Sequence, residues 1–200
     1  MNSTSAVSMD HGELLRYLRE LAAFTGLPAV WCGSDRRHLG ESLADLLVRL
    51  LCPDLVYVQI KAPMAADTLE VVRAARVLDV GARAGEISKA LAPWLPCDTL
   101  TTAALALPRP LGDGLLNAIM TPLGAGGAFG VVMAASGQCN FPTEEDRLVL
   151  SIAANQAAVV LQRWRAEEAL RASRAGLRDG GVIAETNGRV AVAQATGAVQ

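Results

Sequence analysis

Residues 141–146 read Phe-Pro-Thr-Glu-Glu-Asp, and an uninterrupted helix-forming run follows them as far as Asp179. Thr143 is a good helix N-cap, because its hydroxyl can accept the amide of the third helical residue. Asp146 stands at that third position and can reach back to the amide of Thr143, an Asp variant of the capping box. The first three helical residues are all acidic, which suits the positive end of the helix dipole. The stretch therefore predicts a long helix that begins directly after Thr143.

The predicted helix is longer than one small globule can cover. We expect its first half to pack on a sheet through Leu148, Ile152 and Val159, together with neighbouring alanines. Beyond Leu161 the apolar content becomes sparse. A terminal helix of this kind is typical of a connector, and it predicts a regulatory module that passes a signal to another part of a protein.

The second half of this helix carries a weak heptad pattern. Opposite charges stand four residues apart in the pairs Arg163–Glu167 and Glu167–Arg171, which supports a helix. The apolar residues that remain are expected to be exposed, and two of them stand seven residues apart. These residues are Trp164, Leu170 and Leu177. We interpret them as the contact of a parallel dimer; the alternative is a solvated helix without a partner.

The rest of the chain alternates helix and strand signals. Apolar periodicity predicts helices over residues 11–25 and around 43–51, and a short one over 84–92. Residues rich in β-branched side chains predict strands over 54–60 and 69–76, and a looser one over 99–107. The clearest hairpin joins 115–123 to 128–135 through a Gly124–Gly127 turn. The order predicts an α+β fold with a central antiparallel sheet flanked by helices.

Composition limits the function classes. The chain has 200 residues, 52% of them apolar, and a net charge of −2, so it can bury one good core and has no basic surface for nucleic acid. No segment reaches the ~20 apolar residues of a membrane span. The first ten residues lack a signal peptide and are expected to be a flexible leader. We therefore expect a cytoplasmic protein.

The C-terminal segment also resembles a known family. Residues 141–162 are similar to the last segment of a GAF domain, a ligand-binding sensory module of bacterial signalling proteins. Residues 164–173 resemble the signalling helix that joins such modules to a PAS domain or a histidine-kinase core, and residues 13–22 and 43–51 are weaker matches to the opening helices. The resemblance implies a GAF-like domain over 11–162 and a signalling or coiled-coil helix over 163–179.

The resemblance places a ligand cavity between the sheet and the segment that links its middle strands, here residues 78–114. Arg109, between two prolines, either holds an anion through a bidentate contact or is a solvent-facing loop residue. Asn117 and Thr121 alternate along a strand and share one face, which lines a pocket or is solvated. The candidate pocket residues are Trp94, Cys97, Thr101, Arg109, Asn117 and Thr121.

No cofactor or metal can be identified from the sequence. The residue set of cyclic-nucleotide-binding GAF domains and the Cys-His pair of bilin-binding ones are missing. His11 and His38 precede the predicted sheet, where neither is placed to ligate haem, and Cys32 with His38 makes only two ligands for a metal. The four cysteines are expected to be small buried hydrophobes, except for an exposed Cys139. The glycines before Gly130 form a turn and lack the Lys-Ser/Thr of a phosphate-binding loop.

These observations predict a non-catalytic input region of a sensor histidine kinase. It would be a homodimer that passes ligand or partner binding to a downstream PAS domain or kinase core. The alternatives are a ligand-free dimerisation scaffold and a thiol redox sensor or enzyme that uses Cys97 or Cys139. Residues 180–200 are expected to be a tail or the start of a following module, with two short strands around Asn187-Gly188.

Overall fold

The structure is a computed structural model of the whole chain. The residues that it describes are 31, 35–62, 68–74, 80–95, 104–110 and 113–195. Side-chain surroundings are described over the same ranges except for residues 80–82, 104 and 175–195. The chain divides into two units, Met1–Leu161 and Gln162–Gln200. The helix predicted over residues 11–25 lies outside the described residues.

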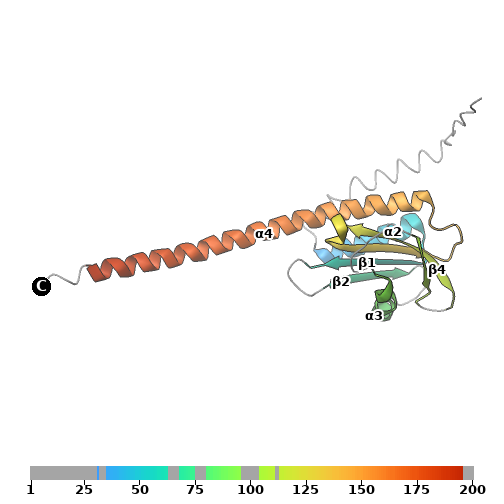
Figure 1. Cartoon of the computed structure of the whole chain (residues 1–200), viewed down its shortest axis with the longest axis horizontal. Helices are drawn as coiled ribbons and strands as arrows, with labels where there is room; N and C mark the ends of the chain where they lie inside the picture. Colours follow the sequence, from blue (N-terminus) through green and yellow to red (C-terminus); the bar gives the residue numbers. More distant parts are fainter. Residues whose placement is uncertain are drawn as a thin grey trace, which may run out of the picture. The chain divides into compact units, whose positions relative to one another are not determined.

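The described elements follow the predicted order of helices and strands (Figure 1). Asp35 caps the first of them, since its Oδ1 accepts the backbone N–H of His38 at 2.7 Å. Along the chain they are α2 (Arg36–Leu51), β1 (Leu55–Lys61), β2 (Thr68–Ala74), α3 (Val80–Leu91), the 3-10 turn η1 (Ala92–Trp94), β3 (Ala104–Pro108), β4 (Leu115–Leu123), the 3-10 turn η2 (Ala125–Gly127), β5 (Gly130–Ser136) and α4 (Glu144–Ala195).

The five strands form one antiparallel sheet in the order β2-β1-β5-β4-β3. β1 lies between β2 and β5, so that Tyr57 is opposite Val72 on one side and Met133 on the other. This confirms the predicted antiparallel α+β architecture and the pairing of the first two strands. β2 and β3 are the edge strands of this sheet.

The two faces of the sheet are covered by different helices. α2 and the first part of α4 lie on one face, and α3 lies on the other (Figure 1). α2 comes close to the sheet because it carries Gly40. A Cβ added there would lie 3.1 Å from Cγ2 of Val71 and 3.4 Å from Cδ1 of Ile60, tighter than ordinary packing. The buried residues of α2 that form this contact layer include Leu39, Leu43 and Leu47.

The face under α3 holds a second apolar cluster. Alternate residues along each strand point to this side, because side chains alternate across a sheet. α3 contributes Ile87 and Leu91, which are both buried. The strands contribute Leu55, Tyr57, Val72, Leu107, Leu116, Ala118, Met120, Val131, Met133 and Ala135.

The β4–β5 connection confirms the predicted hairpin. Gly124 and Gly126 have positive φ values of 77° and 59°, which residues with a side chain rarely adopt, and the N–H of Phe129 donates to the carbonyl of Leu123 at 3.0 Å. At Gly130, with φ 134°, an added Cβ would collide with the carbonyl oxygen of Gln59. β5 therefore begins at a glycine because its neighbour β1 comes too close for any other residue.

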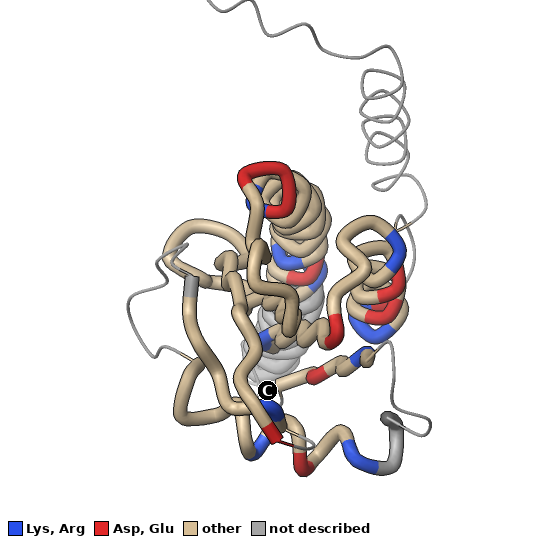
Figure 2. The backbone as a smooth tube through the Cα atoms, turned by 90° about the vertical axis from the view of Figure 1, so that its right-hand side faces the viewer, with Lys and Arg blue, Asp and Glu red and all other residues tan. Residues whose placement is uncertain are grey.

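α4 begins with the predicted capping box. The N–H of Asp146 donates to Oγ1 of Thr143 at 3.1 Å, and the N–H of Thr143 donates to Oδ2 of Asp146 at 2.8 Å. The acidic residues of this first turn are the red segment at the start of the long helix in Figure 2. The reciprocal bonds satisfy two backbone donors that a helix start leaves without helical partners.

The buried side of α4 differs from the prediction. Leu148 and Val159, which were expected to pack on the sheet, are 52% and 60% exposed, and Ile152 is only half-buried. Two leucines and two valines make the contact instead, together with the alanines that were expected there. The buried residues are Val149, Leu150, Ala153, Ala154, Ala157, Ala158, Val160 and Leu161.

The two short strands expected around Asn187-Gly188 are not formed. α4 continues through Gly180-Gly181 to Ala195. A glycine costs about 1 kcal/mol relative to alanine inside a helix, which weakens a helix without ending it. The Asn187-Gly188 dipeptide is thus part of α4 and not a hairpin turn.

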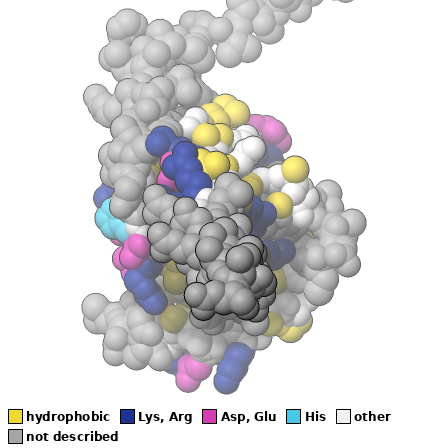
Figure 3. All heavy atoms as spheres, turned by 90° about the vertical axis from the view of Figure 1, so that its left-hand side faces the viewer, with side chains coloured by type: hydrophobic (Ala, Val, Ile, Leu, Met, Phe, Trp, Pro, Cys, Tyr) yellow, Lys and Arg dark blue, Asp and Glu magenta, His cyan; other side chains and the backbone are white. Residues whose placement is uncertain are grey.

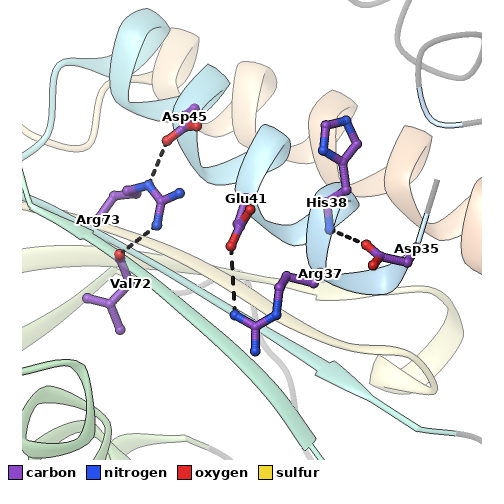
Figure 4. Close-up of polar contacts among 7 residues, drawn as sticks. All are labelled: Asp35, Arg37, His38, Glu41, Asp45, Val72 and Arg73. Atoms are coloured by element: carbon purple, nitrogen blue, oxygen red, sulfur yellow. Dashed lines mark hydrogen bonds and ion pairs between the residues drawn. The ribbon is translucent and has the colours of Figure 1, made fainter. Parts of the chain in front are cut away.

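Arg73 links the edge strand β2 to α2 (Figure 4). Its Nε lies 2.6 Å from Oδ1 of Asp45, and its Nη1 donates to the carbonyl of Val72 at 3.3 Å. One guanidinium therefore ties the helix to the strand and occupies a carbonyl of the strand itself.

Among the described helices, none is both long enough and apolar enough to cross a membrane.

Candidate functional site

A small hollow lies on the α3 side of the sheet, where β1 and β4 begin and β2 ends. Its volume is about 40 Å³. The walls are mostly apolar, and two charged side chains stand among them. The lining residues are Asp54, Leu55, Ala74, Ile87, Arg109, Pro110 and Leu116.

The two charged residues of the hollow form an ion pair. Nη2 of Arg109 lies 3.6 Å from Oδ2 of Asp54, which is beyond the usual length of a hydrogen bond. The same Oδ2 accepts the backbone N–H of Gly137 at 2.7 Å. The side chain of Asp54 is 17% exposed and that of Arg109 is 33% exposed. The carboxylate is therefore held firmly, whereas the guanidinium touches it only loosely.

The strand ends explain why these residues meet. Arg109 directly follows β3, and its backbone N–H donates to the carbonyl of Gly114 at 2.9 Å, closing the β3–β4 loop. Asp54 directly precedes β1, and Gly137 directly follows β5. A Cβ on Gly137 would lie 2.9 Å from Nη2 of Arg109 and 3.2 Å from Oδ2 of Asp54. Glycine at this position lets the backbone come up to the ion pair.

A buried tyrosine supplies the second polar feature of the α3 side. The hydroxyl of Tyr57 donates to Oε1 of Glu70 at 2.8 Å and accepts from Nε2 of Gln59 at 3.2 Å. Burial, and then the bond to the Glu70 carboxylate, raise the pKa of Tyr57 well above its ordinary value, while Ser88 on α3 acts in the opposite direction through a hydrogen bond. The tyrosine thus stays neutral and joins β1 to β2 and α3.

The predicted pocket residues do not all come together. Arg109 lines the hollow, and Trp94 is exposed on η1. Cys97 and Thr101 lie outside the described residues. Asn117 and Thr121 share one face of β4, as predicted. It is the face opposite to the hollow, since the residues between them, Ala118 and Met120, belong to the α3-side cluster.

Asn117 and Thr121 differ in how their polar groups are satisfied. Nδ2 of Asn117 donates to the carbonyl of Gln138 at 3.1 Å, which links β4 to the loop after β5. Thr121 is buried, and its Oγ1 has no hydrogen-bond partner. Burying a hydroxyl without a partner costs free energy. Thr121 therefore faces the packed helices, and it neither lines the hollow nor faces solvent.

The cysteine prediction requires one correction. Cys52, expected to be buried, is exposed at the C-cap of α2, where its φ of 46° and its N–H bond to the carbonyl of Val48 end the helix. Cys139 is exposed, as predicted. Cys32 and Cys97 lie outside the described residues. Among the described residues, no group of three or more His, Cys, Asp or Glu side chains is placed to hold a metal ion.

Within the second unit, the predicted ion pairs of α4 are present. Nε of Arg163 lies 2.9 Å from Oε1 of Glu167, and Nη2 of Arg171 lies 3.4 Å from Oε2 of the same glutamate. Leu170 is exposed, whereas Trp164, expected to be exposed, is half-buried. Leu177 lies within α4, but its side chain is outside the described part.

Sequence reasoning missed Asp54 and Tyr57. A signal for the tyrosine existed, because Tyr57 and Gln59 alternate on one strand and a glutamate lies on the neighbouring strand. No local pattern marked Asp54, which contacts Arg109 and Gly137, 55 and 83 residues away along the chain.

On the face seen in Figure 3, acidic and basic side chains are interspersed, so no large patch of one charge appears among the described residues shown there.

Comparison with known proteins identifies the fold. No protein-family profile and no curated protein sequence matches the chain. The GAF domain of a candidate sensor histidine kinase from Pseudomonas syringae pv. tomato has a TM-score of 0.53 and 19% identity, over 80% of this chain and 99% of that one. Two GAF domains with lower TM-scores also match.

The second GAF domain of DevS from Mycobacterium smegmatis has a TM-score of 0.44 and 24% identity, over 68% of this chain and 99% of that one. The GAF domain of an Acinetobacter phosphoenolpyruvate-protein phosphotransferase has a TM-score of 0.42 and 13% identity, over 74% of this chain and 95% of that one. The fold assignment rests on the Pseudomonas domain. The chain has the fold of a GAF domain, as the resemblance of residues 141–162 predicted.

Proposed function

We propose that this chain is a non-catalytic sensory module of a bacterial signalling protein, the cytoplasmic input region of a sensor histidine kinase. In this proposal the chain is a homodimer, and α4 passes the binding of a ligand or a partner protein to a downstream PAS domain or kinase core. A ligand that binds one arrangement of the module better than another shifts the population between the two.

The continuous helix α4 carries this proposal. It starts at a complete capping box beside the sheet and runs unbroken from Glu144 to Ala195. In this proposal, a change at the sheet that moved the start of α4 is passed on along the continuous helix. The GAF fold supports the proposal too, since the Pseudomonas domain that resembles this chain belongs to a candidate sensor histidine kinase.

The small size of the hollow favours a second candidate function. Ligand pockets of drug-sized molecules usually measure about 300–1,000 Å³, whereas this hollow measures about 40 Å³. A GAF-fold scaffold that dimerises or docks a protein needs no pocket. The two functions differ in whether a small molecule accompanies the purified protein.

Native mass spectrometry of the full chain, purified from a bacterial host, tests both. We expect a dimer, with an added mass for the sensory module and without one for the scaffold. The variant Leu170→Glu places a charge on an exposed apolar position of α4 and is expected to weaken the dimer at least tenfold. A chain that stays monomeric at high concentration would contradict the dimeric helix.

Ala172→Glu is the matched control for this experiment. Residue 172 is exposed on the same helix, two positions further along, so its side chain points to a different side. It adds the same charge and is expected to leave the dimer unchanged. Equal weakening by both variants would indicate a general charge effect and not a contact at Leu170.

A further inference from the structure

We propose that the hollow beside Asp54 and Arg109 binds small monocarboxylates of about two or three carbons. The proposal rests on the proposed sensory function and names the class of its ligand. It follows from three properties of the hollow: an incompletely used guanidinium, apolar walls and a small volume.

The guanidinium of Arg109 has hydrogen-bonding capacity to spare. Arginine carries five N–H donors in a planar fork that matches a carboxylate. In the described part of the chain, its guanidinium contacts the Asp54 carboxylate through Nη2 at 3.6 Å. The side chain is two-thirds buried, with 33% exposed, so the group is fixed in place yet still open at the mouth of the hollow.

The Asp54 carboxylate does not compete fully for that guanidinium. Its Oδ2 already accepts the N–H of Gly137 at 2.7 Å, and Asp54 makes a further interaction as well. The carboxylate is therefore stabilised by other groups when a second anion shares Arg109. It also opposes that anion as a like charge, which limits the affinity and selects against ligands with two negative charges.

The walls and the volume set the rest of the ligand. Behind the charged pair lie Leu55, Ala74, Ile87 and Leu116, which offer no polar group to a ligand. A volume of about 40 Å³ holds about three water-sized spheres, since one water needs roughly 10–15 Å³. A methyl or ethyl group fits this space, with the carboxylate at the mouth against Arg109.

The test is a titration of the unmutated 200-residue chain with propionate, propionamide and hexanoate, followed by ¹H–¹⁵N NMR. Propionamide has the same shape without the charge, and hexanoate has the same charge on a longer chain. We expect propionate to bind at least tenfold more tightly than either, with shifts centred on Arg109, Gly137 and Ile87. Equal binding of propionate and propionamide would overturn the role of Arg109.

Two variants and one control locate the binding. Arg109→Gln removes the positive charge and is expected to weaken the binding of propionate at least tenfold. Ala74→Val narrows the hollow without changing any charge, so it provides an independent check if the first variant folds poorly. Arg83→Gln is the control, because Arg83 is exposed on α3 and pairs with Glu86. Unchanged propionate binding in both Arg109→Gln and Ala74→Val would reject the site.

The outcomes separate this inference from the proposed function. If propionate causes no shifts but the protein purifies as a dimer with a different bound mass, the ligand class is wrong and the sensory function stands. If propionate binds to a strictly monomeric chain, the site exists and the dimeric signalling helix fails. If neither a small acid nor any added mass binds a dimer, the scaffold function is favoured.

Discussion

The two faces of the sheet are built on different principles. On one face, α2 and the first part of α4 pack through leucines and alanines that are almost completely removed from solvent. On the other face, α3 contributes two buried apolar side chains among its described residues. Around them lie a small hollow, an ion pair and a hydrogen-bonded tyrosine. The first face is suited to holding the fold together. The second retains the space and the polar groups that a binding site requires.

Truncation of one core side chain on each face gives the largest expected contrast. Leu43 and Ile87 are both fully buried, and such truncations to alanine cost about 2–5 kcal/mol. We expect Leu43→Ala to lower the unfolding free energy by about 4 kcal/mol. Ile87→Ala is expected to lower it by only about 2 kcal/mol, because Ile87 already borders a hollow. Urea unfolding measures both, with the exposed Leu148→Ala as a control within about 0.5 kcal/mol of wild type.

A substitution in the capping box tests how firmly the start of α4 is held on the face of the sheet that α2 also covers. Thr143→Ala removes the acceptor for the N–H of Asp146, and it is expected to cost about 1 kcal/mol of unfolding free energy. Amide hydrogen exchange at residues 145 and 146 should accelerate. Thr143→Ser keeps the hydroxyl and should restore slow exchange. Rapid exchange in wild type would mean that the cap does not hold the helix start.

Tyr57→Phe tests the polar group of the second face. It removes the hydroxyl that bonds Glu70 and Gln59, and it is expected to destabilise the protein by about 1 kcal/mol. The raised pKa also has a pH consequence. The folded state keeps the proton above pH 10, the ordinary pKa of tyrosine, where the unfolded chain releases it.

The contribution of Tyr57 is therefore fully present below pH 10 and is lost as the pH rises above it. Wild type should lose stability between pH 9 and 11 more steeply than Tyr57→Phe, as measured by urea unfolding in this range. Parallel pH profiles for the two proteins would show that the tyrosine is not held neutral by the fold.

Thr121→Val gives the smallest expected effect, and its sign is opposite. The Thr121 hydroxyl is buried on the first face without a partner, so an isosteric methyl removes a desolvated polar group. We expect a gain of about 0.5 kcal/mol in unfolding free energy. A loss of more than about 1 kcal/mol would mean that the hydroxyl has a partner, such as a buried water. The contrast with Tyr57→Phe would then disappear.

Local patterns predicted the framework well and the site poorly. The capping box, the hairpin turn and the strand signals depend on neighbours in sequence, so they could be found from the residues themselves. The hollow depends on the ends of four strands, and its pair Asp54–Arg109 joins residues far apart along the chain. The sheet-facing side of α4 was also misjudged. Leu148 and Val159 were placed on that side, whereas Leu150 and Leu161 pack there beside the expected alanines.

Arg73 has a consequence for how this protein behaves in concentrated solution. Edge strands can recruit a second chain into the sheet and so begin aggregation. β2 is such an edge, and Arg73 occupies the carbonyl of Val72 while Asp45 holds the guanidinium in position. Replacing Asp45 by alanine removes that restraint. Substitutions at residue 45 thus bear on shelf life through β2, the same strand whose last residue, Ala74, lines the hollow.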